Sequence, residues 1–383
     1  MRAILRPTPA AREPRRSRSA RPVALAAALA LAVTSACGNG APSDEGTGPG
    51  ENDRTGSPPG EPSAVASDLE VPWGMDFLPD GSALVTERDS GRVLRVTPEG
   101  DTREVGAVTD AEARGEGGLL GLAVPRDAGE RPYVYVYYTT GSDNRITRMR
   151  YDPDDGLGDE EVLVDGIPSA SFHNGGRLAF GPDGMLYATT GDAGEGQRAQ
   201  NPDSLGGKIL RMTPEGEPAD GNPGGDLVHS QGHRNVQGLA WDDQDRLFAS
   251  EFGQDTWDEI NLVEPGNNYG WPEVEGTGGG GDYTDPLLTW TPEEASPSGA
   301  AIAGGSLWVA ALRGQRLWEV PITGDGGDPL GEPREHYATE FGRLRTVDAV
   351  PDGEGLWLTT SNRDGRGQPE ENDDRILTVP LQE

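Results

Sequence analysis

The chain has 383 residues, of which 65 are acidic and 32 are Lys or Arg, so its formal net charge is −33 at neutral pH. An acid excess of this size repels phosphate backbones and anionic lipid surfaces, which excludes nucleic-acid binding as a function. A single cysteine excludes a disulfide framework and a cysteine-based zinc site within the chain, and 57 Gly with 32 Pro favour many turns over long helices.

The first 36 residues have the pattern of an export signal. Seven arginines precede an apolar run over residues 23–33, which is too short to span a bilayer, and small residues then lead to Cys37. This segment resembles a bacterial lipoprotein signal. The resemblance implies cleavage after residue 36, lipidation of Cys37 and anchoring of an exported protein to the outer face of the plasma membrane. An ordinary secretory peptide with an incidental cysteine is the alternative.

Residues 37–63 have the composition of a flexible tether. They are Gly, Pro, Ser, Asp and Glu almost throughout, without apolar periodicity. Such a segment cannot bury enough apolar surface to offset the loss of chain entropy on ordering. We therefore expect the folded domain to occupy residues 64–383.

One strand pattern recurs six times after the tether. Each unit contains an apolar strand, a turn that is often Pro-Asp-Gly, a second apolar strand, a polar loop and a closing strand. The six units begin at Trp73, Gly121, Arg177, Gly238, Gly299 and Arg345. A period of roughly 45–60 residues is typical of a propeller blade, so the sequence predicts an all-β, six-bladed β-propeller as a single domain. A pair of β-sandwiches would not explain why one pattern returns in the same order.

A histidine and an aspartate flank the first hairpin of the third unit. His173 stands directly before the first strand of that unit, and Asp192 stands at the end of the second strand. A hairpin of this length brings its two ends together, so Asp192 is placed to orient the imidazole, as a general base requires. A loop histidine that is hydrogen-bonded for structural reasons is the alternative.

Two further polar clusters open the fourth and sixth units. Arg234, Asn235 and Gln237 stand on a turn-to-strand segment that leads into a predicted polar channel. Arg343 and Arg345 have period-two spacing, which places both guanidinium groups on one face of a strand. Such a pair fits two carboxylates or a phosphate, and salt bridges to nearby acids are the alternative.

Five motifs occur in order along the chain. They are Gly115-Glu-Gly-Gly-Leu-Leu-Gly121, His173-Asn-Gly-Gly-Arg-Leu with Gly191-Asp192, Gly232-His-Arg-Asn-Val-Gln-Gly238, Ser250-Glu-Phe-Gly-Gln with Asp258-Glu-Ile-Asn, and Asn268-Tyr-Gly-Trp-Pro272. Together they resemble the soluble PQQ-dependent glucose/sorbosone dehydrogenase family, which includes the bacterial aldose sugar dehydrogenases. The resemblance extends from about residue 67 to the C-terminus.

The resemblance implies an enzyme that oxidises the anomeric hydroxyl of an aldose to the lactone, with hydride transfer to PQQ. His173 would be the general base, Asp192 would orient its imidazole, and Arg234 would polarise the accepting carbonyl of the cofactor. Four residues besides Arg234 would contact PQQ: Asn235, Arg313, Arg343 and Arg345. Against the acidic background, these arginines form an expected local cationic site for an anionic cofactor.

Calcium ligands follow from the same resemblance. Gly253 and Gln254 would ligate Ca²⁺ through backbone carbonyl oxygens, which leave no side-chain signature in a sequence. Glu259 and Tyr269 stand where some members of the family bind additional Ca²⁺.

Three positions depart from the family pattern. Glu116, which with Gln237 is an expected substrate contact, stands where the sugar-side loop often has Gln and adds negative charge there. Gln254 stands where Pro is frequent, which a backbone-carbonyl ligand tolerates. Arg313 stands where a cofactor-binding Lys is frequent, whereas the only lysine of the chain, Lys208, lies in a closing strand.

Two other functions stay open at this point. One is a non-catalytic propeller lipoprotein that binds a sugar or a protein, and the other is a Ca²⁺-dependent lactonase-type hydrolase. The hydrolase needs carboxylate and amide side chains that converge on a metal in the channel, and the sequence shows no obvious set. The expected partners are an aldose, PQQ, Ca²⁺ and an electron acceptor of unknown identity. Membrane contact is expected only through the lipid on Cys37.

Overall fold

The computed structural model describes residues 58–126, 129, 132–324 and 329–381. The predicted signal peptide, Cys37 and most of the predicted tether therefore lie outside the described residues. Within the described ranges, no helix is long and apolar enough to cross a membrane.

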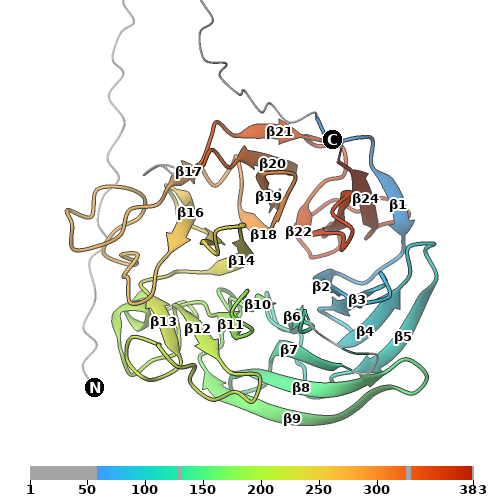
Figure 1. Cartoon of the computed structure of the whole chain (residues 1–383), viewed down its shortest axis with the longest axis horizontal. Coiled ribbons are helices and arrows are strands. Elements are labelled where there is room, and N and C mark those ends of the chain that lie inside the picture. Colours follow the sequence, from blue (N-terminus) through green and yellow to red (C-terminus); the bar gives the residue numbers. More distant parts are fainter. Residues whose placement is uncertain (1–57, 127–128, 130–131, 325–328, 382–383) are drawn as a thin grey trace, which may run out of the picture. The chain divides into compact units, whose positions relative to one another are not determined.

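The described chain forms six four-stranded antiparallel sheets around a central axis (Figure 1), which confirms the predicted six-bladed propeller. The helical element of the described residues is a single 3-10 turn, η1 (Gly196–Gln200). The first three sheets are β2 (Pro72–Phe77), β3 (Ala83–Glu87), β4 (Arg92–Val96) and β5 (Thr102–Ala107); β6 (Leu119–Ala123), β7 (Tyr133–Thr139), β8 (Asn144–Asp152) and β9 (Gly156–Ile167); and β10 (Leu178–Phe180), β11 (Leu186–Thr189), β12 (Lys208–Met212) and β13 (Val228–Gln231). The last three are β14 (Val236–Trp241), β15 (Leu247–Glu251), β16 (Asp258–Val263) and β17 (Leu288–Trp290); β18 (Pro297–Ala303), β19 (Ser306–Ala311), β20 (Arg316–Pro321) and β21 (Arg334–His336); and β22 (Leu344–Ala349), β23 (Gly355–Thr360), β24 (Ile376–Pro380) and β1 (Ser63–Ala66).

The innermost strand of each sheet positions the functional residues. Strands β2, β6, β10, β14, β18 and β22 lie nearest the axis, and neighbours such as β2 and β6 pack side by side (Figure 1). Because all six sheets repeat one topology, these strands begin at the same mouth of the channel. Residues that are far apart in the sequence therefore meet there.

The ring is closed by the N-terminal strand. β1 pairs with β24 in the antiparallel sense, with Ser63 opposite Thr378, so the first and last described strands share the sixth sheet. Gly60 extends the contact, because its N–H donates to the carbonyl of Pro380 at 2.8 Å. The sequence predicted a folded domain from residue 64, but it did not predict that its first strand belongs to the sixth sheet.

Apolar side chains of facing sheets fill the space between blades. One cluster packs Trp73 and Leu120 of the first two sheets against Leu178 and Leu210 of the third, all at most 3% exposed. Middle strands such as β3 and β11 are buried along their whole length. The core therefore lies between the sheets, and polar groups are left for the two ends of the channel.

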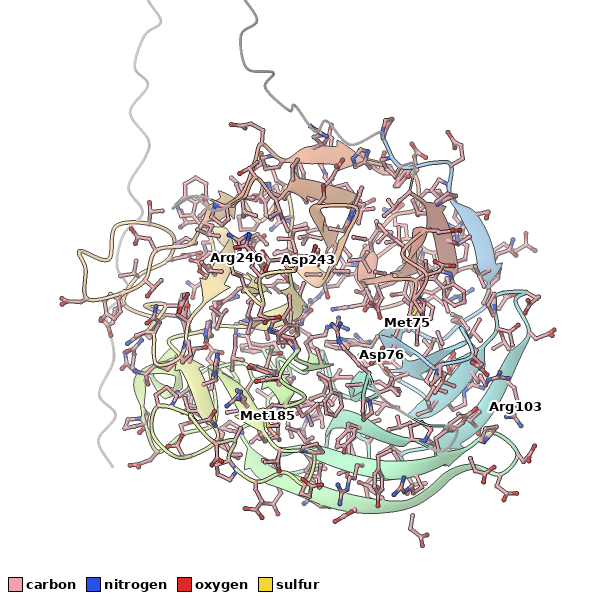
Figure 2. All side chains as sticks on the ribbon, viewed as in Figure 1. Met75, Asp76, Arg103, Met185, Asp243 and Arg246 are labelled. Carbon is pink, nitrogen blue, oxygen red and sulfur yellow. The ribbon has the colours of Figure 1, made fainter. Side chains whose placement is uncertain are left out.

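Two carboxylates lie toward the far ends of the adjacent innermost strands β2 and β22. Figure 2 shows Asp76 on the side of its sheet that faces the centre of the ring. Asp76 accepts the N–H groups of Phe77 and Val124 at 2.8 and 2.7 Å, and Asp348 accepts that of Ala349 at 2.9 Å. Burial raises the pKa of Asp76 to about 6, and burial together with the charge of Asp76 raises the pKa of Asp348 well above its ordinary value.

We expect this pair to make the fold less stable as the pH rises. Each of these carboxyls has a higher pKa in the folded protein than in the unfolded chain. Such a carboxyl stabilises the folded state at pH values below its unfolded pKa. This stabilisation is lost as the pH rises through the folded pKa. Arg177 and Arg126 lower the pKa of Asp348 but do not cancel its rise. Asp348→Asn keeps an acceptor for the Ala349 N–H and removes one charge. Its Tm should therefore fall less between about pH 5 and pH 8 than that of the unsubstituted protein.

Thermal unfolding in EDTA at a series of pH values measures this difference. Asp352→Asn, on an exposed turn of the same sheet, removes the same charge and serves as the control. An equal fall of Tm in the Asp348 variant and the unsubstituted protein would contradict the expectation.

Candidate active site

A cavity of about 200 Å³ lies at the mouth where the innermost strands begin. Three apolar side chains form part of its wall: Trp73, Phe252 and Leu312. Three guanidinium groups and two carboxylates contribute to its polar lining: Arg88, Arg345, Arg366, Glu116 and Asp364. In a chain with a net charge of −33, these charged side chains are cationic on balance. The cavity therefore suits an anionic and partly apolar ligand.

The structure brings His173 and Asp192 into contact, as the hairpin length predicts. The imidazole Nδ1 lies 2.8 Å from Asp192 Oδ1. The same carboxylate accepts the N–H of Gly194 at 2.7 Å and the indole N–H of Trp271 at 2.9 Å. The two ends of the hairpin are so close that a Cβ at Gly191 would lie 1.9 Å from the carbonyl oxygen of His173. Glycine at that position therefore permits the pair to form.

The protonation of the pair follows from its surroundings. Burial acts to raise the pKa of Asp192, but the hydrogen bond and charge of His173 and the other donors outweigh it and hold the pKa below its ordinary value. Because an ionised carboxylate only accepts, Nδ1 of His173 carries the proton and donates it to Asp192. Nε2 is then the ring nitrogen left to act on another molecule, and the side chain is 16% exposed. This is the geometry of a general base with an orienting carboxylate.

Glu116 connects His173 to the rim of the cavity. Its Oε2 accepts the backbone N–H of His173 at 3.0 Å, and its Oε1 lies 2.7 Å from Nη1 of Arg366. Burial acts to raise the pKa of Glu116, but the charge of Arg366 and the His173 N–H lower it further than burial raises it. Glu116 thus lies at the cavity as an ionised group, and Arg366 is a partner that sequence reasoning missed.

Arg234 and Asn235 lie beside the histidine pair. The N–H of Asp192 donates to the carbonyl of Arg234 at 2.9 Å. Nη1 of Arg234 donates to the carbonyl of Gly253 at 2.6 Å, and its guanidinium lies over the ring of Trp271, 5.3 Å from the ring centroid. Nε of Arg234 and Nδ2 of Asn235 are buried without a hydrogen-bond partner among the described residues. Two buried donors beside the histidine pair therefore lack an acceptor among the described residues.

Arg343 and Arg345 both approach the carboxylate of Asp364, which is the salt bridge to a nearby acid that the sequence left open as the alternative for this pair. Nε and Nη2 of Arg343 donate to Asp364 Oδ2 at 3.0 and 2.8 Å, and Nη2 of Arg345 lies 3.7 Å from the same oxygen. Nη1 of Arg345 donates to Gln237 Oε1 at 2.9 Å, whereas its Nε has no partner within the described structure. Burial lowers the pKa of Arg345 to about 9. Gln237 therefore lines the cavity and also holds Arg345 in place.

Asp364 is a site residue that sequence reasoning missed. It lies in the loop after β23, in the run Arg363-Asp364-Gly365-Arg366. Burial acts to raise its pKa, but the charges of Arg345 and Arg343 lower it below the ordinary value. The concentration of charge in a loop that follows a buried strand was the available signal.

Gly253 and Gln254 lie in the turn between β15 and β16. The N–H of Gly253 donates to Asp258 Oδ1 at 2.9 Å, and its carbonyl accepts from Arg234. A Cβ at Gly253 would lie 1.7 Å from the carbonyl oxygen of Trp257, so this tight turn requires glycine. The carbonyl that is expected to ligate Ca²⁺ thus already faces a cationic group.

Glu259 and Tyr269 line a second, much smaller cavity of about 10 Å³. Burial and then the charge of Glu251 raise the pKa of Glu259 to about 8. The hydroxyl of Tyr269 donates to a backbone carbonyl at 2.6 Å and its ring stacks on His233, so its side chain belongs to the packed interior. The described residues contain no group of three or more His, Cys, Asp or Glu side chains placed to hold a metal ion. Glu251 and Glu275 also line this cavity, so a cation here would draw on backbone oxygens and on these neighbouring carboxylates as well as on Glu259.

Of the expected cofactor contacts, Arg345 lines the larger cavity and Arg234 the smaller one, whereas the side chain of Arg313 points away from both. Its side chain is 56% exposed and pairs with Glu293 at 2.6 Å. In the turn that follows β19, Leu312 lines the cavity instead, and the next side chain points outward to this acid. The family position alone was therefore a poor guide to the orientation of Arg313.

A buried network that sequence reasoning missed holds the backbone of Arg234. One carboxylate oxygen of Glu251 accepts the N–H of Arg234, and the other lies 2.9 Å from Nδ1 of His233. Nε2 of His233 lies 2.8 Å from the hydroxyl of Ser230. These three side chains belong to residues that are at most 3% exposed, so a substrate does not reach them. The Ser–His–Glu chain therefore positions Arg234 and is not a catalytic triad.

Lys208 is completely buried, and it holds the loop that follows Asp192. Its Nζ donates to the carbonyl oxygens of Arg198, Ala199 and Gly206 at 2.8, 2.9 and 3.1 Å. Burial lowers the pKa of Lys208 to about 8. The contacts are with η1 and the loop after it, so Lys208 acts as a structural clamp.

We expect Glu251→Gln to lower the free energy of unfolding by about 2–4 kcal/mol, because the amide places a donor where the carboxylate accepts N–H groups. Urea denaturation of the metal-free protein measures this loss. Glu264→Gln, on the exposed turn after the neighbouring strand β16, is the matched control and should change stability by less than about 0.5 kcal/mol. Equal stability of the two variants would show that the buried network does not depend on the carboxylate.

The fold and the site define an enzyme-like propeller, in which a histidine–carboxylate pair lies close to a cation-lined cavity. The family model described as Glucose / Sorbosone dehydrogenase matches residues 69–369. The chain therefore belongs to the glucose/sorbosone dehydrogenase family, which confirms the classification that the motifs predicted.

Individual relatives agree with this classification. The structure of the PQQ-bound form of aldose sugar dehydrogenase from Streptomyces coelicolor is 52% identical, with a TM-score of 0.80 over 85% of this chain and 100% of that chain. Aldose sugar dehydrogenase YliI of Escherichia coli is 28% identical over 335 residues, which are 78% of this chain and 89% of the relative. Quinoprotein glucose dehydrogenase B of Acinetobacter calcoaceticus is 34% identical over 249 residues, which are 55% of this chain and 52% of the relative.

Proposed function

We propose that the protein is an exported, PQQ- and Ca²⁺-dependent dehydrogenase that oxidises the anomeric hydroxyl of an aldose to the lactone. The observation that carries the proposal is the His173–Asp192 pair near a cavity with guanidinium groups in its lining. The relatives support the cofactor, because one is a quinoprotein and one matched structure is a PQQ-bound aldose sugar dehydrogenase.

The donors of the site fit PQQ, a planar quinone that carries carboxylates. Nε of Arg345, Nε of Arg234 and Nδ2 of Asn235 are buried donors without a described partner, and carboxylate and quinone oxygens are acceptors. Arg343 and Arg345 would hold carboxylates, and Arg234 with Asn235 would contact the quinone. When bound, PQQ supplies an electrophilic quinone that accepts a hydride.

The turn at Gly253 and Gln254 fits Ca²⁺. Backbone carbonyls are the hard oxygen ligands that this ion prefers. A carbonyl oxygen has two lone pairs, so the carbonyl of Gly253 can accept from Arg234 and ligate a cation at the same time. An additional Ca²⁺ beside Glu259 and Tyr269 is also proposed, because the carboxylates of Glu251 and Glu259 line one small cavity together with Tyr269.

The chain supplies the proton chemistry. Oxidation at the anomeric carbon removes a proton from the hydroxyl and a hydride from the carbon. Nε2 of His173 takes the proton, since Nδ1 is held by Asp192. The carboxylate of Asp192 stabilises the imidazolium that forms. The guanidinium of Arg234, buried beside the pair, is a fixed charge in a site of low dielectric, where it polarises an oxygen strongly.

Glu116 and Gln237 are the proposed sugar contacts, since both line the cavity. Gln237 Oε1 accepts from Arg345 at 2.9 Å and from Ser298 at 3.0 Å, so this side chain is held in one orientation. The carboxylate of Glu116 can accept sugar hydroxyl groups, and its charge is balanced by Arg366. We therefore propose neutral aldoses as the substrate class.

The other functions have less support. A Ca²⁺-dependent lactonase needs carboxylate and amide side chains that converge on a metal, whereas the family that the chain belongs to is described as Glucose / Sorbosone dehydrogenase. A sugar-binding protein without catalysis would leave the His173–Asp192 pair without a chemical role.

Reconstitution tests the proposed activity. Purified protein with added PQQ and Ca²⁺ should reduce an artificial electron acceptor when an aldose is present. His173→Ala should lower kcat by about 10²–10⁴-fold and leave PQQ binding intact, because the imidazole takes a proton and does not hold the cofactor. His336→Ala, on the outer strand β21, is the control and should keep its activity.

Absence of PQQ binding at micromolar cofactor would contradict the proposed function. Sugar binding without electron transfer, unchanged in the His173 variant, would support the non-catalytic alternative. Lactone turnover without a quinone would support the hydrolase.

Export and anchoring are proposed from residues 1–37. If Cys37 carries the lipid, Cys37→Ser should move the protein from the membrane fraction to the soluble exported fraction, because a single thiol is the attachment point. Fractionation and immunoblotting measure this distribution. An unchanged distribution would contradict lipidation at Cys37.

A further inference from the structure

The turn between β15 and β16 is held by one carboxylate oxygen from another part of the chain. Oε1 of Glu275 accepts the backbone N–H groups of four consecutive residues, at distances of 2.7 to 3.1 Å. These donors are Gln254, Asp255, Thr256 and Trp257. Burial acts to raise the pKa of Glu275, but the four N–H groups lower it below its ordinary value. An ionised oxygen at the centre of the turn therefore fixes its backbone.

The direction of the carbonyl groups follows from these bonds. A peptide unit is planar and trans, so its N–H and its C=O point in opposite directions. The N–H of Gln254 belongs to the same peptide unit as the carbonyl of Gly253, and the N–H of Asp255 belongs with the carbonyl of Gln254. Because both N–H groups point at Glu275, the carbonyls of Gly253 and Gln254 point away from it. These are the two oxygens proposed to ligate Ca²⁺.

A second carboxylate continues the same arrangement. Oδ1 of Asp258 accepts the N–H of Gly253 at 2.9 Å, which turns the carbonyl of Phe252 to the opposite side. Nη1 of Arg234 lies 3.3 Å from the carbonyl oxygen of Phe252 and 2.6 Å from that of Gly253. A cationic group is thus found on the side to which these carbonyls point.

Space around the turn leaves little freedom for another backbone arrangement. A Cβ at Gly253 would lie 2.7 Å from Oε1 of Glu275 as well as 1.7 Å from the carbonyl oxygen of Trp257. Glu275 therefore packs directly against the turn and does not reach it through a flexible contact.

We propose that Glu275 is a positioning residue for the calcium site, which orients the carbonyls of Gly253 and Gln254 toward the ion. This inference rests on the proposed function, because that function places Ca²⁺ at these carbonyls. Glu275 does not ligate the ion in this scheme. Partners that orient metal ligands commonly change metal affinity by about 10–100-fold when they are removed.

The test is Ca²⁺ binding to the full-length, PQQ-free protein, measured by calorimetry and by the Ca²⁺-dependent rise in Tm. Glu275→Ala should weaken binding at least about tenfold. The Ca²⁺ affinity of Glu275→Gln should lie between those of Glu275→Ala and the unsubstituted protein, since its amide oxygen still accepts N–H groups. Asp282→Asn removes one charge from an exposed position of the same loop and should bind like the unsubstituted protein.

Three further measurements separate positioning from other effects. Tm in EDTA shows whether each variant is folded, and hydrogen exchange of the amides at 254–257 should speed up in Glu275→Ala. The loss of affinity should persist at high salt, because a pure charge effect would be screened there.

The outcomes are distinct. Unaltered Ca²⁺ binding by Glu275→Ala, or a loss that disappears at high salt, would overturn the role of Glu275 and leave the proposed enzyme intact. Absence of Ca²⁺ binding by the unsubstituted protein would overturn the metal site itself, and the role of Glu275 with it.

Discussion

The candidate site depends on closure of the ring by strands β1 and β24. The sixth sheet and the loop after its strand β23 contribute Arg345 and Asp364 to the cavity, whereas Trp73 belongs to the first sheet and Arg88 to the turn after its strand β3. These residues share one cavity only because the first and last sheets stand side by side. The hydroxyl of Thr346 donates to the carbonyl of Trp73 at 2.6 Å across this junction, over a sequence separation of 273 residues. The pairing of β1 with β24 at the outer edge of the ring therefore keeps the cavity residues together at its centre.

Buried guanidinium groups make the site suited to an anionic ligand. Arg345 lies in an environment that lowers its pKa to about 9, and burial lowers the pKa of Arg177 to about 10. The guanidinium of Arg177 donates to the carbonyl of Gln237 at 2.7 Å and lies 4.5 Å from the centroid of the Trp73 ring. Holding such groups away from water costs free energy, which an anionic ligand can offset on binding. The charges are fixed before a ligand arrives, so little reorganisation is needed.

Local patterns predicted contacts within one blade better than contacts between blades. The His173–Asp192 pair follows from the length of one hairpin. Arg343 and Arg345 both reach Asp364, although Arg343 lies before β22 and the register of β22 shifts between Leu344 and Thr346. The partners Asp364, Arg366 and Glu275 lie in loops, and their meeting points depend on how whole sheets and long turns are placed. No regular spacing of residues in the sequence predicts where these loops meet. Arg313 was predicted to contact the cofactor from its position in the family pattern, but its side chain points outward to Glu293. The position of a turn residue in the sequence does not fix the side to which its side chain points.

The only lysine of the chain has a consequence for covalent chemistry. Lys208 is completely buried, and its amine is engaged by three carbonyl oxygens. The folded domain thus offers no lysine ε-amine to acylating reagents, aldehyde cross-linkers or reducing sugars that glycate proteins. If the protein oxidises aldoses as proposed, its folded domain presents no lysine amine with which these sugars can form a Schiff base. Chemical modification of Lys208 would therefore indicate that the third blade had unfolded locally and exposed its amine.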